Sequence, residues 1–177
     1  LGRHNWENIA AAVSVCKLFD VDEQIIKKTI EQFENLPHHL EVLRTVNGIT
    51  YIDDAISTNI EPAIAAIDAI ETPIVLIVGG HDKGLEFTLL GGKILSAKNL
   101  KAVIVIGEVT DKILESMKGF KGKIFTGAKN MDEILSQAHA VAVPGDPILI
   151  SPATDSFDMF KNMYDRAEQF VNAVAKL

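Results

Sequence analysis

Three polar stretches carry the side chains of this sequence that could bind or activate a substrate. Each follows a short apolar run of the kind that forms a buried strand; they are residues 53–59, 79–84 and 151–156. Ligands of open α/β sheets bind outside the carboxyl ends of the strands, so the three stretches are predicted to meet at one edge of a sheet. Carboxylates, a lysine and several hydroxyls would then face one site.

Asp53 and Asp54 directly follow an apolar run and admit two interpretations. They could hold a divalent cation or accept hydrogen bonds from a ribose hydroxyl. They could equally cap the following turn as Asx residues, without any ligand. Thr58, followed by Glu61 and Pro62, is predicted to cap a helix, and the first N–H groups of a helix also favour an anion.

Lys83 follows the pair Gly79-Gly80 and offers a flexible positive charge for a carboxylate or a phosphate. Neither G-x-x-x-x-G-K-[ST] nor G-x-G-x-x-G occurs, so no P-loop is predicted, and the glycine pair alone also suits an ordinary loop. Ser156 lacks the G-x-S-x-G context of a nucleophile. At the expected start of a long helix, it suits a capping or carboxylate-binding role better.

Three polar residues of the first forty could also face a ligand. His38 and His39 are adjacent, and on a strand they would point to opposite faces, so a shared metal ion is disfavoured. Contact of a histidine with a phosphate or with adenine near a domain boundary is the stronger hypothesis. Asn8 lies one turn after His4 on a predicted helix, where it could also be an ordinary surface residue.

Hydrophobic spacing predicts the first elements that must position these residues. Two helices are expected in the first thirty-odd residues, with Asp20 or Asp22 capping the second. The dipeptide Leu36-Pro37 marks a boundary, because the residue before proline disfavours the α conformation. The apolar stripe of the first predicted helix is Ile9, Val13 and Cys16, and that of the second is Ile26, Ile30 and Phe33.

Beyond the boundary, the pattern predicts a sheet. Asn47-Gly48 indicates a hairpin between residues 40–46 and 49–52. Further apolar runs alternate with helical stripes, which predicts an α/β fold: a Rossmann-like, doubly wound, mostly parallel sheet. The runs are residues 74–78, 102–106, 123–125 and 147–150; the stripes are Ile60, Ile64 and Ile67, then Ile134, Leu135 and Ala138, then Phe160, Tyr164, Ala167, Val171 and Val174.

Composition limits the partners. The 177 residues include 17 basic and 24 acidic ones, a net charge of −7, which disfavours nucleic acid and anionic membrane surfaces. No apolar stretch approaches the roughly 20 residues of a membrane-spanning helix. The single Cys16 excludes an internal disulfide and suits a reducing compartment, so we expect a cytoplasmic protein and a monomer.

Five segments together resemble the C-terminal part of the Mur ligase family, the ATP-dependent amide-forming enzymes of peptidoglycan synthesis. The resemblance is strongest to the branch that adds D-glutamate. The matching segments are H-N-x-x-N-x-x-A-A at residues 4–12, L-P-H-x-x-E at 36–41, D-x-x-x-T-N at 54–59, G-G-x-x-K at 79–83 and S-P-A-x-x-S-x-D-x-F at 151–160. Each alone is weak, but the ordered set spans nearly the whole sequence.

The resemblance implies roles for particular residues. On the ATP side, Asn8 would contact adenine, with His39, Asp54 and Thr58 nearby, while Lys83 and Ser156 would hold the carboxylates of D-glutamate. Met163 stands where the family often has an aromatic residue beside D-glutamate. No catalytic or metal-binding residue is implied. ATP and Mg²⁺ would serve the full-length enzyme, with UDP-N-acetylmuramoyl-L-alanine as the acceptor.

The sequence departs from the family pattern at one loop and at a phosphate contact. His39 replaces an arginine that is suited to forked phosphate contacts, and Ala55 and Ile56 replace a serine and a frequent lysine. The loop after Asp54 therefore carries less polar chemistry than in the family.

The resemblance also implies a division of the sequence. Residues 1–36 resemble the last helices of the family's central ATPase domain, and residues 37–177 its C-terminal, amino-acid-binding domain. The sequence begins with Leu1 and has no P-loop, so we expect a fragment that is inactive alone. The alternatives are another Mur ligase, a ligase like folylpolyglutamate synthase, or a non-enzymatic receiver-like binding module with Asp53 and Asp54 as its acidic pocket.

Overall fold

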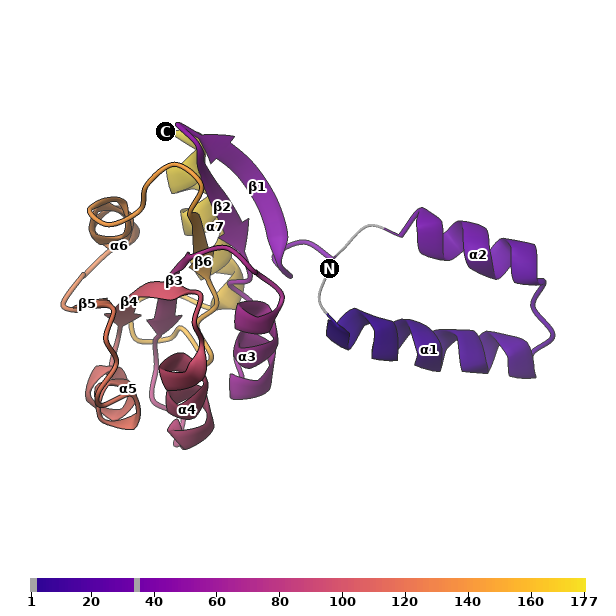
Figure 1. The fold of residues 1–177 in the computed structure, drawn as a ribbon, viewed down its shortest axis with the longest axis horizontal. Helices are drawn as coiled ribbons and strands as arrows, with labels where there is room; N and C mark the ends of the chain where they lie inside the picture. The colour runs from indigo at the N-terminus through magenta and orange to yellow at the C-terminus, as the bar shows by residue number, and fades with distance from the viewer. Residues whose placement is uncertain (1–2, 34–35) are drawn as a thin grey trace.

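The computed structural model describes residues 3–33 and 36–177, with side chains from residue 6 onward. Its centre is a six-stranded sheet of order β1-β2-β6-β3-β4-β5, in which only the edge strand β1 is antiparallel to its neighbour (Figure 1). The predicted mostly parallel α/β sheet is confirmed. The strands are β1 (Glu41–Val46), β2 (Ile49–Asp53), β3 (Ile74–Gly79), β4 (Leu100–Ile106), β5 (Lys123–Phe125) and β6 (Pro147–Ile150).

Helices cover both faces of the sheet, with α3, α4 and α5 on one face and α6 and α7 on the other (Figure 1). Alternate residues along each strand enter opposite cores: Leu76 packs on the α3–α5 side, and Ile77 packs on the α6–α7 side. Every residue of β3 is buried, as expected of a central parallel strand. These helices are α3 (Ile60–Asp68), α4 (Thr88–Ser96), α5 (Thr110–Ser116), α6 (Met131–His139) and α7 (Met163–Ala175).

The first two helices, α1 (Arg3–Leu18) and α2 (Glu23–Glu31), form a helical hairpin that projects away from the sheet (Figure 1). Asp22 caps α2, because its carboxylate accepts from the N–H groups of Gln24 and Ile25, while Asp20 lies in the turn. The helix ends at Glu31, before the expected stop at Leu36-Pro37, and Phe33 lies beyond it. Two helices are therefore confirmed, but the second is shorter than its apolar stripe.

The β1–β2 hairpin has the predicted turn. Asn47 and Gly48 both adopt positive φ, at 51° and 81°, which is the geometry that the Asn-Gly pair favours in a two-residue hairpin. The turn places Asp53 at the carboxyl end of β2 and directs the chain towards α3.

Three helix expectations need correction. No apolar stripe was predicted for α4 or α5. In α4, Gly91 and Gly92 lower the helix propensity, and Gly91 allows close approach to Ser116 at the end of α5, which is only seven residues long. Asn59, not Thr58, occupies the N-cap of α3.

The last helix differs most from its predicted stripe. It begins at Met163 with Asn162 as cap, so Phe160 precedes it and Ser156 does not stand at its start. Tyr164 is exposed, whereas Phe170 and Ala173 are buried. The inward face also includes Arg166, which a search for apolar spacing passes over.

Candidate functional site

The three polar stretches do meet at one edge of the sheet, as predicted. They follow β2, β6 and β3, which are neighbours in the sheet. The ammonium of Lys83 joins the three loops. Its Nζ donates to the Thr58 carbonyl oxygen at 2.7 Å, to Asn59 Oδ1 at 3.2 Å and to Asp155 Oδ1 at 3.1 Å. We call these loops, residues 53–59, 79–84 and 151–156, the rim.

The close approach of the rim loops requires glycine. Gly80 has a φ of 145°, and a Cβ there would overlap the carbonyl oxygen of Asp155. The N–H of the following residue, His81, donates to that same carbonyl at 2.8 Å, and the Thr154 hydroxyl donates back to the His81 carbonyl at 2.7 Å. The glycine pair thus positions two loops against each other.

Asp54 is buried in the rim loop that follows β2. Its carboxylate accepts from the Ser151 hydroxyl at 2.6 Å and from the Leu40 N–H at 3.2 Å. Burial raises the pKa of this carboxyl, and the hydrogen bond from Ser151 opposes that shift. Asp53 accepts from the Ala55 N–H at 2.9 Å, which is the Asx arrangement that the sequence left open.

Ser156 is distinct from the other rim hydroxyls. It is 1% exposed, and among the described residues its Oγ has no hydrogen-bond partner. A buried unpaired hydroxyl has an unmet demand for a hydrogen bond, so it marks a place where a polar ligand would be favoured. Met163 lies at the start of α7 and is half-buried.

A cavity of about 960 Å³ lies between the helical hairpin and the rim. Three of the four predicted ATP-side residues line it: Asn8 from α1, His39 from the linker, and Asp54 from the rim. Thr58 is outside this lining and instead offers its carbonyl to Lys83. The residues that line the cavity are mostly apolar. They include Trp6, the single tryptophan of the sequence, which was not predicted as a site residue. The other apolar lining residues are Ile9, Ala12, Ile30, Phe33, Leu36, Leu40, Pro62 and Ala65.

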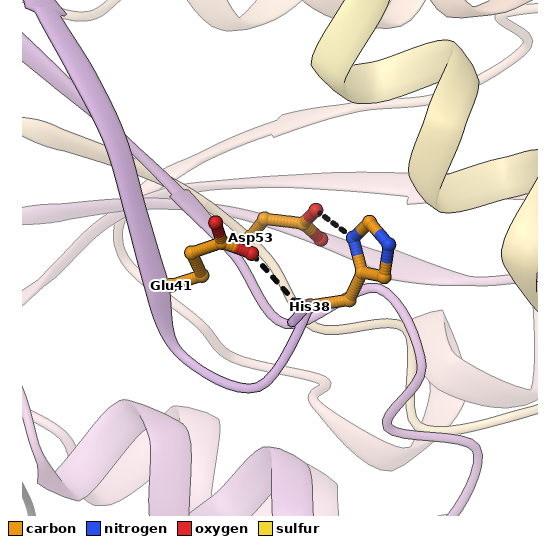
Figure 2. A group of neighbouring side chains, drawn as sticks. All are labelled: His38, Glu41 and Asp53. Carbon is orange, nitrogen blue, oxygen red and sulfur yellow. Dashed lines mark hydrogen bonds and ion pairs between the residues drawn. The ribbon is translucent and has the colours of Figure 1, made fainter. Parts of the chain in front are cut away.

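The turn before β1 and the facing ends of β1 and β2 together supply the one group of side chains in the described residues that could chelate a metal ion. His38, Glu41 and Asp53 each offer a ligand atom within 4.8 Å of the others (Figure 2). Here they satisfy one another: His38 Nδ1 lies 2.7 Å from Asp53 Oδ2, and the His38 N–H donates to Glu41 Oε2 at 2.9 Å. These bonds anchor the turn that joins the hairpin to the sheet.

The two adjacent histidines do not lie on a strand, so the expected alternation of strand side chains does not apply to them. They lie in a turn in which His38 adopts a φ of 64°. His38 joins the carboxylates of β1 and β2, whereas His39 lines the cavity. The divergence of the pair follows from the turn rather than from strand alternation.

The rim and cavity also contain residues that sequence reasoning did not identify. Arg166 is fully buried behind the rim, and burial lowers its pKa to about 10. His81 packs edge-on against Phe157, with ring centroids 6.1 Å apart. A charged residue on a predicted inward helix face was the available signal for Arg166, but it requires knowing which face is buried.

Among the helices of the described residues, none has the length and apolar character that a membrane-spanning segment needs.

Comparison with known proteins gives consistent matches. Residues 38–154 match the family model described as Mur ligase, glutamate ligase domain. Over 99% of its length, the chain is 36% identical to a UDP-N-acetylmuramoylalanine–D-glutamate ligase of Salinibacter ruber and 37% identical to one of a Thermoanaerobacter species. It spans 38% and 39% of those relatives, so most of their length has no counterpart here.

Solved structures show the same fold at low sequence identity. A UDP-N-acetylmuramate–alanine ligase of Thermotoga maritima superposes with a TM-score of 0.73 at 15% identity, covering 99% of this chain and 39% of that one. A folylpolyglutamate synthase of the same organism gives 0.59 at 16% identity, covering 95% and 39%. These likenesses support the architecture, including the hairpin, and nothing finer.

Proposed function

Because the chain belongs to the Mur ligase family, we propose that it is the amino-acid-binding part of an ATP-dependent ligase that adds D-glutamate to UDP-N-acetylmuramoyl-L-alanine. The proposed substrate comes from the names of the relatives, and the proposed binding site for D-glutamate is the rim. The family membership sets aside the receiver-like module, and the sequence identity favours the D-glutamate branch over other Mur ligases and folylpolyglutamate synthase.

The proposed reaction has two steps in the complete enzyme. The γ-phosphoryl group of ATP passes to the carboxylate of UDP-N-acetylmuramoyl-L-alanine, which releases ADP and forms an acyl phosphate. The amine of D-glutamate then attacks the acyl carbon, loses a proton and expels inorganic phosphate as the amide forms. The contribution of this chain is to hold the amine in line, an effect worth at most roughly 7–11 kcal/mol.

The observation that carries the proposal is that Lys83 and the Ser156 hydroxyl, which has no hydrogen-bond partner among the described residues, lie on the same rim. A lysine ammonium attracts a carboxylate, and the Ser156 hydroxyl can donate to one. In the free protein, Asp155 Oδ1 holds the Lys83 ammonium at 3.1 Å, which keeps this charge at the rim before substrate arrives. Met163 is proposed to contact the carbon chain of D-glutamate.

The cavity suits the nucleotide. Its apolar walls and the exposed ring of Trp6, 69% accessible, can cover a planar base, while Asn8 can hydrogen-bond to its edge. His39 and Asp54 are proposed to face the ribose and phosphates from the rim side, with Thr58 nearby. Residues 1–36 would then belong to the neighbouring ATPase domain and residues 37–177 to the amino-acid-binding domain.

Mg²⁺, which is expected with ATP, does not fit Asp53 and Asp54, the two buried carboxylates of the rim. The Asp54 oxygens accept from Ser151 and Leu40, and Asp53 accepts from Ala55 and pairs with His38. These carboxylates are internal hydrogen-bond acceptors, so we derive no step from a metal ion held here.

Two substitutions in the complete enzyme test the assignment. Lys83→Met and Ser156→Ala should each raise the D-glutamate KM about ten- to a hundredfold, since a hydrogen bond to a charged group contributes about 1.5–3 kcal/mol. The KM for ATP should change much less. Lys112→Met is the matched control, because Lys112 pairs with Asp82 at the end of the same edge without joining the three loops.

Equal increases in the KM values for D-glutamate and ATP would contradict the assignment of Lys83 and Ser156. A parallel assay with L-glutamate and a folate acceptor tests the alternative ligase. Amide formation with that pair and not with D-glutamate would replace the proposed substrate while leaving the family membership intact.

A further inference from the structure

One buried arginine connects the loops of the rim from behind. Arg166 projects from α7, and its side chain is fully buried. Its Nε and Nη2 donate to the Ala55 carbonyl at 3.2 and 2.9 Å, and its Nη1 donates to the carbonyls of Thr154 and Asp155 at 3.1 and 3.2 Å. A single guanidinium thus holds the loop after β2 and the loop after β6.

The partners of Arg166 are unusual for a buried charge. Each of its hydrogen bonds in the described structure ends on a backbone carbonyl oxygen, not on a carboxylate. Asp158, Asp155 and Asp53 favour its charged form only through space, and burial lowers its pKa to about 10, which leaves it charged near neutral pH. Burying a charge without a direct ion pair costs stability, so core packing alone does not explain an arginine here.

The loop after β3 meets the same group. The Asp155 carbonyl accepts from both Arg166 Nη1 and the His81 N–H, so it links α7 to the loop that carries Lys83. A Cβ on Gly80 would lie 3.3 Å from Arg166 Nη1. The guanidinium therefore lies where all three rim loops converge.

The loop after β6 needs such support. Ala153 adopts a φ of 64°, a left-handed conformation that is strained for a residue other than glycine. Its N–H donates to the Ser57 carbonyl at 3.1 Å, which ties the strained residue to the loop after β2. The carbonyls held by Arg166 come from the next two residues, Thr154 and Asp155, immediately before Ser156.

We propose that Arg166 is a positioning residue of the ligase reaction, which sets the spacing between the loop bearing Asp54 and the loop bearing Ser156. The inference rests on the proposed function. Arg166 touches no substrate; it acts through the carbonyls of Ala55, Thr154 and Asp155. A planar fork can donate in two directions at once, which lysine cannot reproduce, so the geometry requires arginine and not merely a positive charge.

The first test is Arg166→Lys in the complete enzyme. We expect the D-glutamate KM to rise about tenfold and kcat to fall, with the circular dichroism spectrum unchanged. Phe170→Leu is the matched control: Phe170 lies one turn away on α7, is fully buried in the apolar core and has no side-chain hydrogen-bonding group that could hold a rim carbonyl. Phe170→Leu should lower the unfolding midpoint by about as much as Arg166→Lys does, while its D-glutamate KM stays within twofold of the wild-type value.

A purely structural role would give both variants the same kinetic profile, and that result would overturn the proposal. An unchanged D-glutamate KM in Arg166→Lys would do the same. If Arg166→Lys does not fold, Arg166→Gln, which keeps two donors without the charge, takes its place with the same expectations.

The second test does not depend on the substrate. In Arg166→Lys, amide hydrogen exchange of Asp54 and Ala153 should accelerate at least tenfold. The Asp54 N–H ties the loop after β2 to the end of β6 at Ile150, and the Ala153 N–H ties the loop after β6 to Ser57. Acceleration confined to α7 would contradict the proposal. If the wild-type enzyme does not use D-glutamate, the proposed function fails, and exchange still decides whether Arg166 holds the loops together.

Discussion

The helical hairpin and the α/β unit differ in how far their apolar side chains are buried. In β3 every residue is buried, and the two cores of the sheet enclose whole faces of five helices. In α2 no residue is buried, and large apolar side chains of the hairpin remain exposed, some of them along the cavity; the exposed ones include Trp6, Val15, Leu18, Phe19, Ile25 and Phe33. Both regions have helical periodicity, so periodicity alone does not create a core.

The difference shows how the candidate site is assembled. The α/β unit fixes the rim by strand order and by hydrogen bonds between loops, whereas the hairpin contributes an apolar wall to the cavity. The turn around His38 lies directly before β1, and hydrogen bonds of His38 hold that turn to β1 and β2.

The largest effect is expected in the core of the sheet. Ile77→Ala should lower the free energy of unfolding by about 2–5 kcal/mol, because it leaves a cavity at a fully buried position of β3. Ile25→Ala in α2, at a side chain that is 59% exposed, should change it by less than about 0.5 kcal/mol. Urea denaturation of both variants measures the contrast, and equal losses would refute it.

The next effect concerns backbone geometry at the rim. Gly80→Ala should destabilise the protein by about 1–3 kcal/mol or more, because of its positive φ and the overlap with Asp155. Gly92→Ala, in α4 with open space around it, should instead stabilise by about 0.5–1 kcal/mol. Thermal melts of the two variants should shift in opposite directions; a shift in the same direction would argue against the rim geometry.

The linker gives a smaller effect. His38→Ala leaves the buried Asp53 Oδ2 without its partner, which should cost about 1–3 kcal/mol and increase protease cleavage between the hairpin and β1. Glu41→Gln is the control, since its amide oxygen can still accept from the His38 N–H. Unchanged cleavage in His38→Ala would show that these bonds do not anchor the turn.

The smallest effect is a dependence on pH. Burial raises the pKa of Asp54 above its ordinary 3.8, so the folded state binds this proton more tightly than the unfolded state. The stability from that proton is complete below pH 3.8 and is lost as the pH rises through the raised pKa. Asp54→Asn should therefore gain stability relative to wild type between pH 3.5 and pH 7. A constant difference across that range would show that Asp54 titrates normally.

The sequence contained much of the fold. The apolar runs at residues 74–78 and 102–106 and the Asn47-Gly48 turn each became the predicted element, because strand burial and turn geometry depend on neighbouring residues in the chain. The convergence of Asp54, Lys83 and Ser156 on one rim also followed, since the carboxyl ends of parallel strands share one edge.

Side-chain partners were decided by the tertiary structure. Thr58 has the residue type of a helix cap, but Asn59 takes that position and also accepts from Lys83, which lies 24 residues away along the chain. In the sequence, Arg166 is a charged residue within an apolar stripe. It is nevertheless buried, because it donates hydrogen bonds to carbonyl oxygens of two loops that are distant in the sequence from each other. Local sequence specifies backbone preferences within a few residues. Which donor meets which acceptor depends on loops that only the assembled sheet brings together.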